Sequence, residues 1–199
     1  MRLPQPDVTG QVPLEKTIKS RRTIRAFAST SIALKDFSQM LWAAQGVIEP
    51  GGFRRSVPSG GALYPIDVYA VVGEGGVQEI DSGVYHYEPK AHEITLVKEG
   101  DYRRELAKAA LGQMWMAGAP VTLIVTAEYE RSSSKYGERG VRYSMIEAGH
   151  VGQNIFLQAE ALGMGAGIVG AFHDQEVIWV AKLHQSHEPL LIMPVGYKK

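Results

Sequence analysis

The sequence of 199 residues carries 21 basic and 21 acidic side chains, and 45% of its residues are hydrophobic. This balance argues against a general nucleic-acid binder or a polybasic membrane-surface protein, and the absence of cysteine excludes disulfides, thiol catalysis and thiolate-bound metals. We expect a cytoplasmic protein with one domain over residues 1–199, without a signal peptide or the run of about 18 apolar residues that a membrane helix needs.

The first third of the chain predicts two helices, a loop and a strand. Residues 1–13 contain three prolines and a glycine and indicate an irregular arm, and a helix is expected from Leu14 to about Arg22. Leu34, Phe37, Leu41 and Ala44 have helical spacing, with Gly46 as the stop. The glycine-rich stretch 51–65 predicts an ordered loop, and "DVYAVVG" (67–73) a strand.

The remaining chain mixes strands and helices. A hairpin is expected over 83–100 with its turn near Pro89 and Lys90, then an amphipathic helix over 101–113 and an apolar strand over 119–129. Serines 132–134 indicate a polar loop, and 141–162 a long helix that is apolar on most sides and therefore central. A further helix near 174–184 and a last strand follow. Because there is no regular strand–helix–strand alternation, we predict an α+β fold.

Two residue spacings resemble known binding motifs, one for dinucleotides and one for metals, but we do not predict either site. Gly165, Gly167 and Gly170 form G-x-G-x-x-G, but here it follows a helix, whereas a dinucleotide fingerprint follows a strand and opens a helix. A close backbone passage beside a ligand or a packed helix is favoured instead. His184 and His187 have a spacing that suits metal, but no third ligand follows at a suitable distance in the sequence. We therefore predict a surface helix end and no metal site.

The long helix carries a polar stripe. Tyr143, Glu147, His150 and Asn154 fall on one helical face. Such a stripe requires an internal hydrogen-bond network, a subunit interface or a ligand. Gly149 and Gly152 are costly inside a helix and indicate that another backbone, such as a partner helix, approaches there.

The stretch "RRTIRAF" (21–27) concentrates three arginines in seven residues. A solvated charge cluster and a bound anion both explain it. In an extended segment Arg21, Thr23 and Arg25 point the same way, and the planar guanidinium bonds two phosphate oxygens at once.

Four stretches together resemble the nitroreductase-like flavoenzymes: "RRTIRAF", "PSGGALYP" (58–65), "EAGHVGQNIFLQAEALGMGAGIVGAF" (147–172) and "PVGYKK" (194–199). Their order and spacing match from about residue 14 to the end. The resemblance implies a nitroreductase-like fold, with a mostly antiparallel sheet flanked by helices, a long buried helix and a domain-swapped type of homodimer. It also implies non-covalent FMN in a site built from both subunits.

The resemblance assigns cofactor-binding roles to particular residues. Arg21, Thr23 and Arg25 would hold the phosphate and ribityl end, with Arg22 as a neighbour. A loop of the other subunit would line the flavin, and a second segment would contact the ring; these residues are Pro58, Ser59, Gly60, Gly61 and Leu63, and Val169, Gly170 and Ala171. Lys198 or Lys199 would add charge at the phosphate.

The stretches "GVYHYEPKAHEITLV" and "KYGERGVRYSMIEAGH" are similar to the SagB-type dehydrogenases, which include oxidases of thiazoline and oxazoline rings. In that branch a Lys-Tyr pair is associated with catalysis, and Lys135 and Tyr136 match it. An exposed lysine and a tyrosine packed on the helix start are the alternative. The resemblance thus implies an FMN oxidoreductase acting between NAD(P)H and a small acceptor; the alternatives are a dehydrogenase of azoline-type substrates and a non-redox flavin-binding module.

Overall fold

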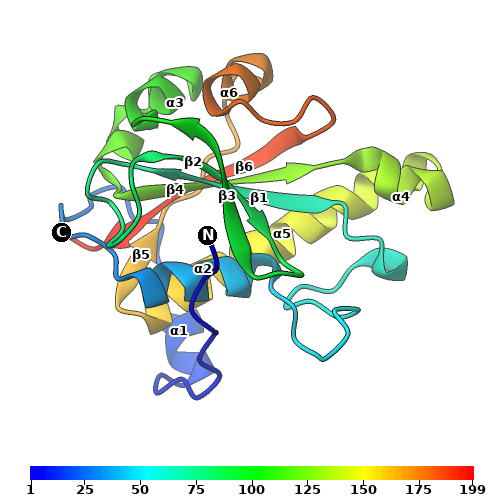
Figure 1. The fold of residues 1–199 in the computed structure, drawn as a ribbon, viewed down its shortest axis with the longest axis horizontal. Helices are drawn as coiled ribbons and strands as arrows, with labels where there is room; N and C mark the ends of the chain where they lie inside the picture. Colours follow the sequence, from blue (N-terminus) through cyan, green and yellow to red (C-terminus); the bar gives the residue numbers. More distant parts are fainter.

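The computed structural model describes residues 1–199 and contains one antiparallel sheet of six strands in the order β3-β2-β1-β4-β6-β5 (Figure 1). The strands are β1 (Ile66–Val72), β2 (Gly83–Glu88), β3 (Glu93–Glu99), β4 (Val121–Ala127), β5 (Met164–Ala166) and β6 (Glu188–Tyr197). The helices are α1 (Leu14–Ser20), α2 (Leu34–Gln45), α3 (Arg103–Ala109), α4 (Tyr129–Tyr136), α5 (Glu138–Ala161) and α6 (Asp174–Ala181), with short 3₁₀ turns at Gly60–Ala62 and Met114–Gly118.

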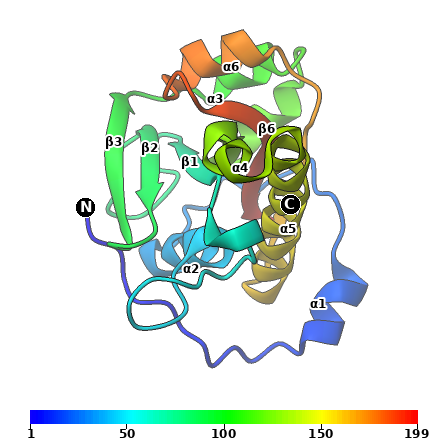
Figure 2. The ribbon, with the colours of Figure 1, turned by 90° about the vertical axis from the view of Figure 1, so that its right-hand side faces the viewer.

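Helices cover both faces of this sheet (Figure 2). The larger core, of 29 buried residues, lies under α2 and α5, and the smaller, of 15, lies under α3 and α6. Neighbouring residues of β1 point to opposite faces, as the period of a strand requires: Val68 joins the larger core and Tyr69 the smaller. Asp67 therefore shares the α3/α6 side with Tyr69.

The expected polar loop at serines 132–134 is wrong, because these residues belong to α4. Ser132 is buried, and the Ser133 hydroxyl donates to the carbonyl of Tyr129 at 3.0 Å. A Cβ at Gly140 would lie 2.4 Å from the backbone nitrogen of Ser133, so α4 and α5 pack backbone to backbone. This packing outweighs the weak helix propensity of serine.

The long helix α5 is buried only in part. Val151 and Ile155 are fully buried, as expected, but Met145 and Ile146 are 52% and 49% exposed. The prediction of an apolar, central helix is therefore wrong for its outward face near the N-terminus. A Cβ at Gly149 would meet nothing within 4 Å, which leaves this face open to a partner.

The arginine-rich segment lies beside the C-terminus of the chain. After α1 ends at Ser20, the backbone is extended; Thr23 forms a bridge to Ala166 and Phe27 a bridge to Lys198. The amide of Ile24 donates to the carbonyl of Ala166 at 2.9 Å. The first and last motifs of the sequence are therefore neighbours. None of the helices is long and apolar enough to cross a membrane.

Candidate functional site

Two arginines of the extended segment have no anionic partner within the chain. The guanidinium of Arg21 lies 5.0 Å above the ring of Phe156, and that of Arg25 lies 5.7 Å from the ring of Trp115. Neither forms an ion pair. Arg22 differs, because its Nη1 donates to the carbonyls of Lys19, Ser20 and Arg21. The structure thus leaves Arg21 and Arg25 available for an anion and folds Arg22 back onto α1.

The C-terminal lysines reach the same edge. Lys198 Nζ is 2.7 Å from Glu160 of α5, whereas Lys199 forms no ion pair, and its amide donates to the carbonyl of Ala26. Both lysines therefore lie near the arginines, and Lys198 already has a carboxylate.

The glycines after α5 come close to the same segment. A Cβ at Gly165 would lie 2.5 Å from Ile24, and one at Gly167 would lie 2.6 Å from Trp115. These two glycines allow a close passage of packed chain, as expected from their spacing. Gly170 is exposed with nothing within 4 Å of its Cβ position, and Val169 is tied to Ile192 of β6. In the 169–171 segment, the backbone of Gly170 is therefore accessible, and the neighbouring Val169 is held in place by β6.

The loop 58–63 lies against α4 and α5. A Cβ at Gly61 would lie 2.6 Å from Tyr136 Oη and 3.0 Å from Lys135 Nζ, and Gly61 has φ of 65°. Only glycine adopts this conformation without strain while leaving room for the two side chains. Lys135 is exposed and Tyr136 is half-buried, its ring packed edge-on against Tyr143 at 5.3 Å. The structure therefore brings the Lys-Tyr pair directly to the expected flavin loop.

The polar residues on one face of α5 differ in their partners: some are hydrogen-bonded within the chain, and others have a polar group without a partner. Asn154 donates to the carbonyls of Ala43 and Ser56 at 3.0 and 3.3 Å, and His150 is exposed. Glu147 is buried, and its Oε1 accepts the amide of Gly60 at 2.9 Å. Its Oε2 is buried without a partner, although Glu147 lines a cavity of about 290 Å³ beside the loop. An unsatisfied buried acceptor at a cavity is suited to a hydrogen-bonding ligand.

We expect Glu147→Gln to stabilise the protein at neutral pH. Burial raises the pKa of Glu147, and the bond from Gly60 only partly opposes it. Because the folded carboxyl binds its proton more tightly than the unfolded one, stability is lost as pH rises through the raised folded pKa. Glutamine keeps an acceptor without the charge. Thermal unfolding between about pH 4 and pH 8 should therefore show a higher Tm and a flatter profile, with the exposed Glu99→Gln as control. A profile parallel to that of the parent would contradict this.

The two halves of the expected cofactor site do not meet within one chain. The arginine side contacts α5 at Phe156, whereas the loop contacts it at Glu147, nine residues earlier. Nine residues correspond to about 14 Å along the axis and to a rotation that places the two residues on opposite sides of the helix. Within one chain, the arginines and the 169–171 segment therefore lie on one side. The loop, together with Lys135 and Tyr136, lies apart from them.

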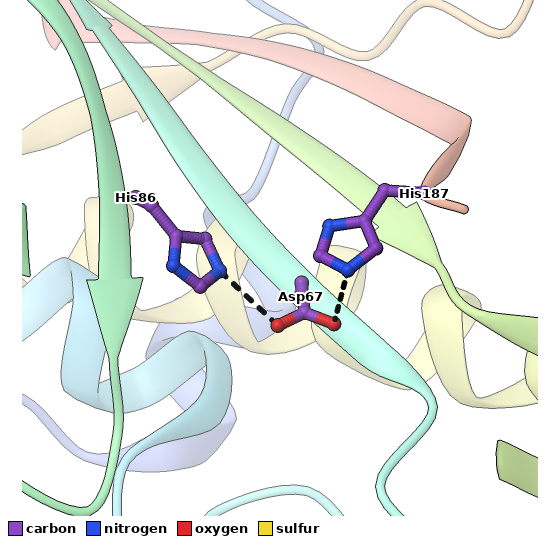
Figure 3. A group of neighbouring side chains, drawn as sticks. All are labelled: Asp67, His86 and His187. Carbon is purple, nitrogen blue, oxygen red and sulfur yellow. Dashed lines mark hydrogen bonds and ion pairs between the residues drawn. The ribbon is translucent and has the colours of Figure 1, made fainter. Parts of the chain in front are cut away.

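A third group of polar side chains was missed by the sequence analysis. His187 is 6% exposed and faces Asp67 of β1 and His86 of β2, so the prediction of a surface helix end without a third ligand is wrong for this residue (Figure 3). His184 is exposed, as predicted. Sequence spacing could not show neighbours that come from different strands. Asp67 and His86 are polar residues on the inward face of apolar strands, and this break in the pattern was the available signal.

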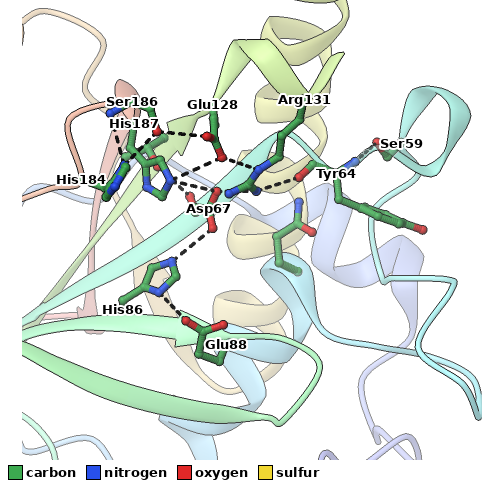
Figure 4. A network of polar contacts seen from close by, with 12 residues as sticks. Ser59, Tyr64, Asp67, His86, Glu88, Glu128, Arg131, His184, Ser186 and His187 are labelled. Carbon is green, nitrogen blue, oxygen red and sulfur yellow. Dashed lines mark hydrogen bonds and ion pairs between the residues drawn. The ribbon is translucent and has the colours of Figure 1, made fainter. Parts of the chain in front are cut away.

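The group belongs to a wider network (Figure 4). His86 Nε2 lies 3.1 Å from Asp67 Oδ1, and Arg131 Nη1 of α4 lies 2.7 Å from Asp67 Oδ2. Burial raises the pKa of Asp67, but the hydrogen bond with His86 and the charge of Arg131 outweigh it, and the net effect is a lowered pKa. Arg131 also pairs with Glu128 and donates to the carbonyl of Tyr64. The network therefore ties α4 to the sheet and to the loop before β1.

Comparison with known proteins gives matches over nearly the whole chain. A family model described as the nitroreductase family matches residues 18–197. A Methanocaldococcus jannaschii protein named for the nitroreductases is 42% identical over 198 residues, which cover 100% of this chain and 97% of that protein. The microcin B17-processing protein McbC of Escherichia coli is 28% identical over 169 residues, which cover 83% of this chain and 62% of that protein.

Solved structures show similar folds. The crystal structure of a Ralstonia eutropha protein, also named for the nitroreductases, has a TM-score of 0.83 at 28% identity, covering 100% of this chain and 89% of that one. The Escherichia coli microcin synthetase McbBCD complex, with truncated pro-MccB17 bound, has a TM-score of 0.77 at 24% identity, covering 100% of this chain and 78% of that one. At 24% identity the second similarity concerns the fold alone.

Proposed function

Because this chain belongs to the nitroreductase family, we propose that it is an FMN-dependent oxidoreductase that transfers hydride or electrons between NAD(P)H and a small organic acceptor. The nitroreductase-like α+β fold with an antiparallel sheet is confirmed. The observation that carries the proposal is the pair Arg21 and Arg25. These two cations lie on one extended segment, and neither has an anionic partner in the chain.

The residues present fit FMN at both of its ends. A phosphate dianion requires several fixed donors, and Arg21, Arg25 and the unpaired Lys199 are cations near one edge of the sheet. At the ring end, Ser59, Gly60 and Glu147 line a cavity of about 290 Å³, and Oε2 of Glu147 has no hydrogen-bond partner. When bound, the flavin supplies the redox chemistry.

The chain's own residues have binding, orienting and proton-holding roles in this proposal. Arg21 and Arg25 bind the phosphate, and the 58–63 loop and 169–171 segment cover the ring and exclude water. Glu147 orients the loop by accepting the Gly60 amide. Tyr136 holds a proton on Oη beside Gly61, and the Lys135 ammonium lies next to it.

We further propose that two chains form each site. The loop of one chain lies on the opposite side of α5 from its own arginines, and the exposed Met145 and Ile146 with the open Gly149 form an apolar outward face on α5. Pairing of this face with a second copy buries it and allows the loop of one chain to approach the arginines of the other.

Gly149→Glu is therefore expected to separate the dimer. In light scattering the parent should give about twice the 21.8 kDa chain mass, and the variant should give a monomer with little bound FMN. The chain itself has room for the new side chain, so the fold should persist. Arg104→Gln, at an exposed position of α3, also makes the charge more negative by one unit and is the control. A parent that is a stable, flavin-loaded monomer would refute the shared site.

A second candidate function is favoured by one contact. The Lys135–Tyr136 pair lies against Gly61, and McbC, named as a microcin B17-processing protein, is among the similar proteins. A SagB-type dehydrogenase that oxidises an azoline or related ring would use such a pair as acid–base groups.

The decisive experiment is the absorption spectrum of the purified protein, followed by turnover assays. A flavin spectrum with anaerobic NADPH oxidation by a nitroaromatic or quinone acceptor supports the first function. Flavin with oxygen-dependent oxidation of an azoline, but without NAD(P)H turnover, supports the second. Flavin without any turnover indicates a flavin-binding module, and failure to bind FMN refutes all three.

A further inference from the structure

Two imidazoles and one carboxylate converge on a point on the α3/α6 side of the sheet (Figure 3). Asp67 Oδ1 is 3.1 Å from His86 Nε2, and Asp67 Oδ2 is 3.6 Å from His187 Nε2. In a tetrahedral zinc site with bonds of about 2.0–2.2 Å, neighbouring ligand atoms lie about 3.3–3.6 Å apart. The two distances between carboxylate and imidazole atoms lie close to this range, and one ligand atom from each of the three residues lies within 4.8 Å of the others.

In each imidazole ring the second nitrogen, Nδ1, also has a hydrogen-bonding partner. His86 Nδ1 lies 2.8 Å from Glu88 Oε1, and His187 Nδ1 lies 2.9 Å from Tyr69 Oη. With the proton on Nδ1, each Nε2 presents its lone pair toward Asp67. Histidines that bind metal almost always donate their other N–H to a carboxylate, a backbone carbonyl or water, and Glu88 is such a partner for His86. The orientation of the rings therefore matches that of ligands.

The charges around this point leave a net negative charge that a cation can offset. Asp67, Glu88 and Glu128 carry three negative charges, and the guanidinium groups of Arg131 and Arg55 lie near Asp67, so one negative charge is left over when the histidines are neutral.

An acidic cavity of about 270 Å³ opens beside His187, one of the three residues. Four carboxylates and no lysine or arginine line it: Glu128, Glu130, Asp174 and Glu188. Such a cleft concentrates cations. Glu128 Oε2 lies 3.9 Å from His187 Nε2, within reach of the same ion after a small movement.

From these observations we propose that Asp67, His86 and His187 bind one divalent transition-metal ion of the zinc class, with Glu128 or water as fourth ligand. Imidazole and carboxylate ligands suit Zn²⁺. The ion joins β1, β2 and the turn before β6, and Arg131 connects it to α4 (Figure 4). Its role is structural: it fixes the helix that carries Lys135 and Tyr136.

The test uses the full chain without a histidine tag, treated with chelator and then titrated with Zn²⁺ by calorimetry. We expect saturable binding of one ion per chain, a higher Tm with Zn²⁺, and intense tetrahedral absorption bands with Co²⁺. His86→Gln and His187→Gln should each weaken binding at least about a hundredfold. Glu88→Gln, which keeps every ligand, should weaken it about tenfold. His184→Gln, in the same turn but exposed, is the matched control and should bind like the parent.

The absence of saturable Zn²⁺ binding by the parent, or parent-like binding by His187→Gln, overturns the proposal. If the ligand variants fail to fold, Glu88→Gln decides the question, because Glu88 is half exposed and its replacement leaves the core intact. Weaker binding by this variant supports the site, and parent-like binding refutes it and leaves an ion-pair network around Asp67.

Discussion

The double variant Arg21→Ala/Arg25→Ala is expected to lose FMN almost completely while still binding riboflavin. Each guanidinium has no carboxylate partner in the chain, so its donors are free for the phosphate. A hydrogen bond to a charged group contributes about 1.5–3 kcal/mol, so each substitution should raise the Kd for FMN about ten- to hundredfold. Riboflavin lacks the phosphate, and its Kd should change little. Fluorescence titration of the chain stripped of flavin measures both constants.

Ionic strength and a distant arginine provide the controls. Added salt should weaken FMN binding to the parent more than to the double variant, because the phosphate contribution is electrostatic. Arg104→Ala removes an exposed cation from α3 that forms no ion pair, and it should leave both constants unchanged. An equal loss of FMN and riboflavin in the double variant would refute the phosphate assignment and indicate a role in folding, since Arg21 also covers Phe156.

The sequence predicted most helices and strands because local patterns determine them. The hairpin β2–β3, helix α2 with Gly46 after it, and the buried strand β4 follow hydrophobic periodicity and turn residues. Helix α4 was missed because Ser132 and Ser133 are held in it by packing against Gly140, a tertiary effect. The exposure of Met145 and Ile146 was missed for a related reason: an apolar residue pattern does not distinguish a buried face from an exposed apolar face.

Some of the candidate site residues could likewise be predicted from the sequence, and others could not. The arginine segment, the glycine loop and the Lys-Tyr pair were selected through resemblance, and the structure adds which of them meet: Lys135 and Tyr136 contact Gly61, and Arg21 contacts Phe156. The Asp67 group was missed because its members are brought together only by strand register and by the turn before β6, although polar residues in two apolar strands were a signal. Sequence spacing reveals ligands on one helix or loop, but not across a sheet.

The second large effect is expected for Lys135→Ala and Tyr136→Phe. Both polar groups lie against the Gly61 backbone, where a Cβ would come within 2.6 Å of Tyr136 Oη and 3.0 Å of Lys135 Nζ. Neither substitution removes a residue of the arginine segment, so FMN content should stay at the parent level. Oxidation of an azoline-type substrate should fall by about a hundredfold, the lower end of the contribution typical of a positioned acid–base group. Stopped-flow reduction of the bound flavin by this substrate measures the step directly.

The comparison between two reactions separates chemistry from structural damage. Hydride transfer from NAD(P)H to a small acceptor requires no side-chain acid or base, so both variants should retain nearly normal NAD(P)H turnover. Ser134→Ala changes an exposed hydroxyl on the same helix, bonded only to the carbonyl of Arg131, and should behave like the parent in both reactions. A loss of both activities would indicate that α4 has moved. Unchanged oxidation of an azoline that the parent oxidises would remove Lys135 and Tyr136 from the mechanism and favour the simple NAD(P)H oxidoreductase.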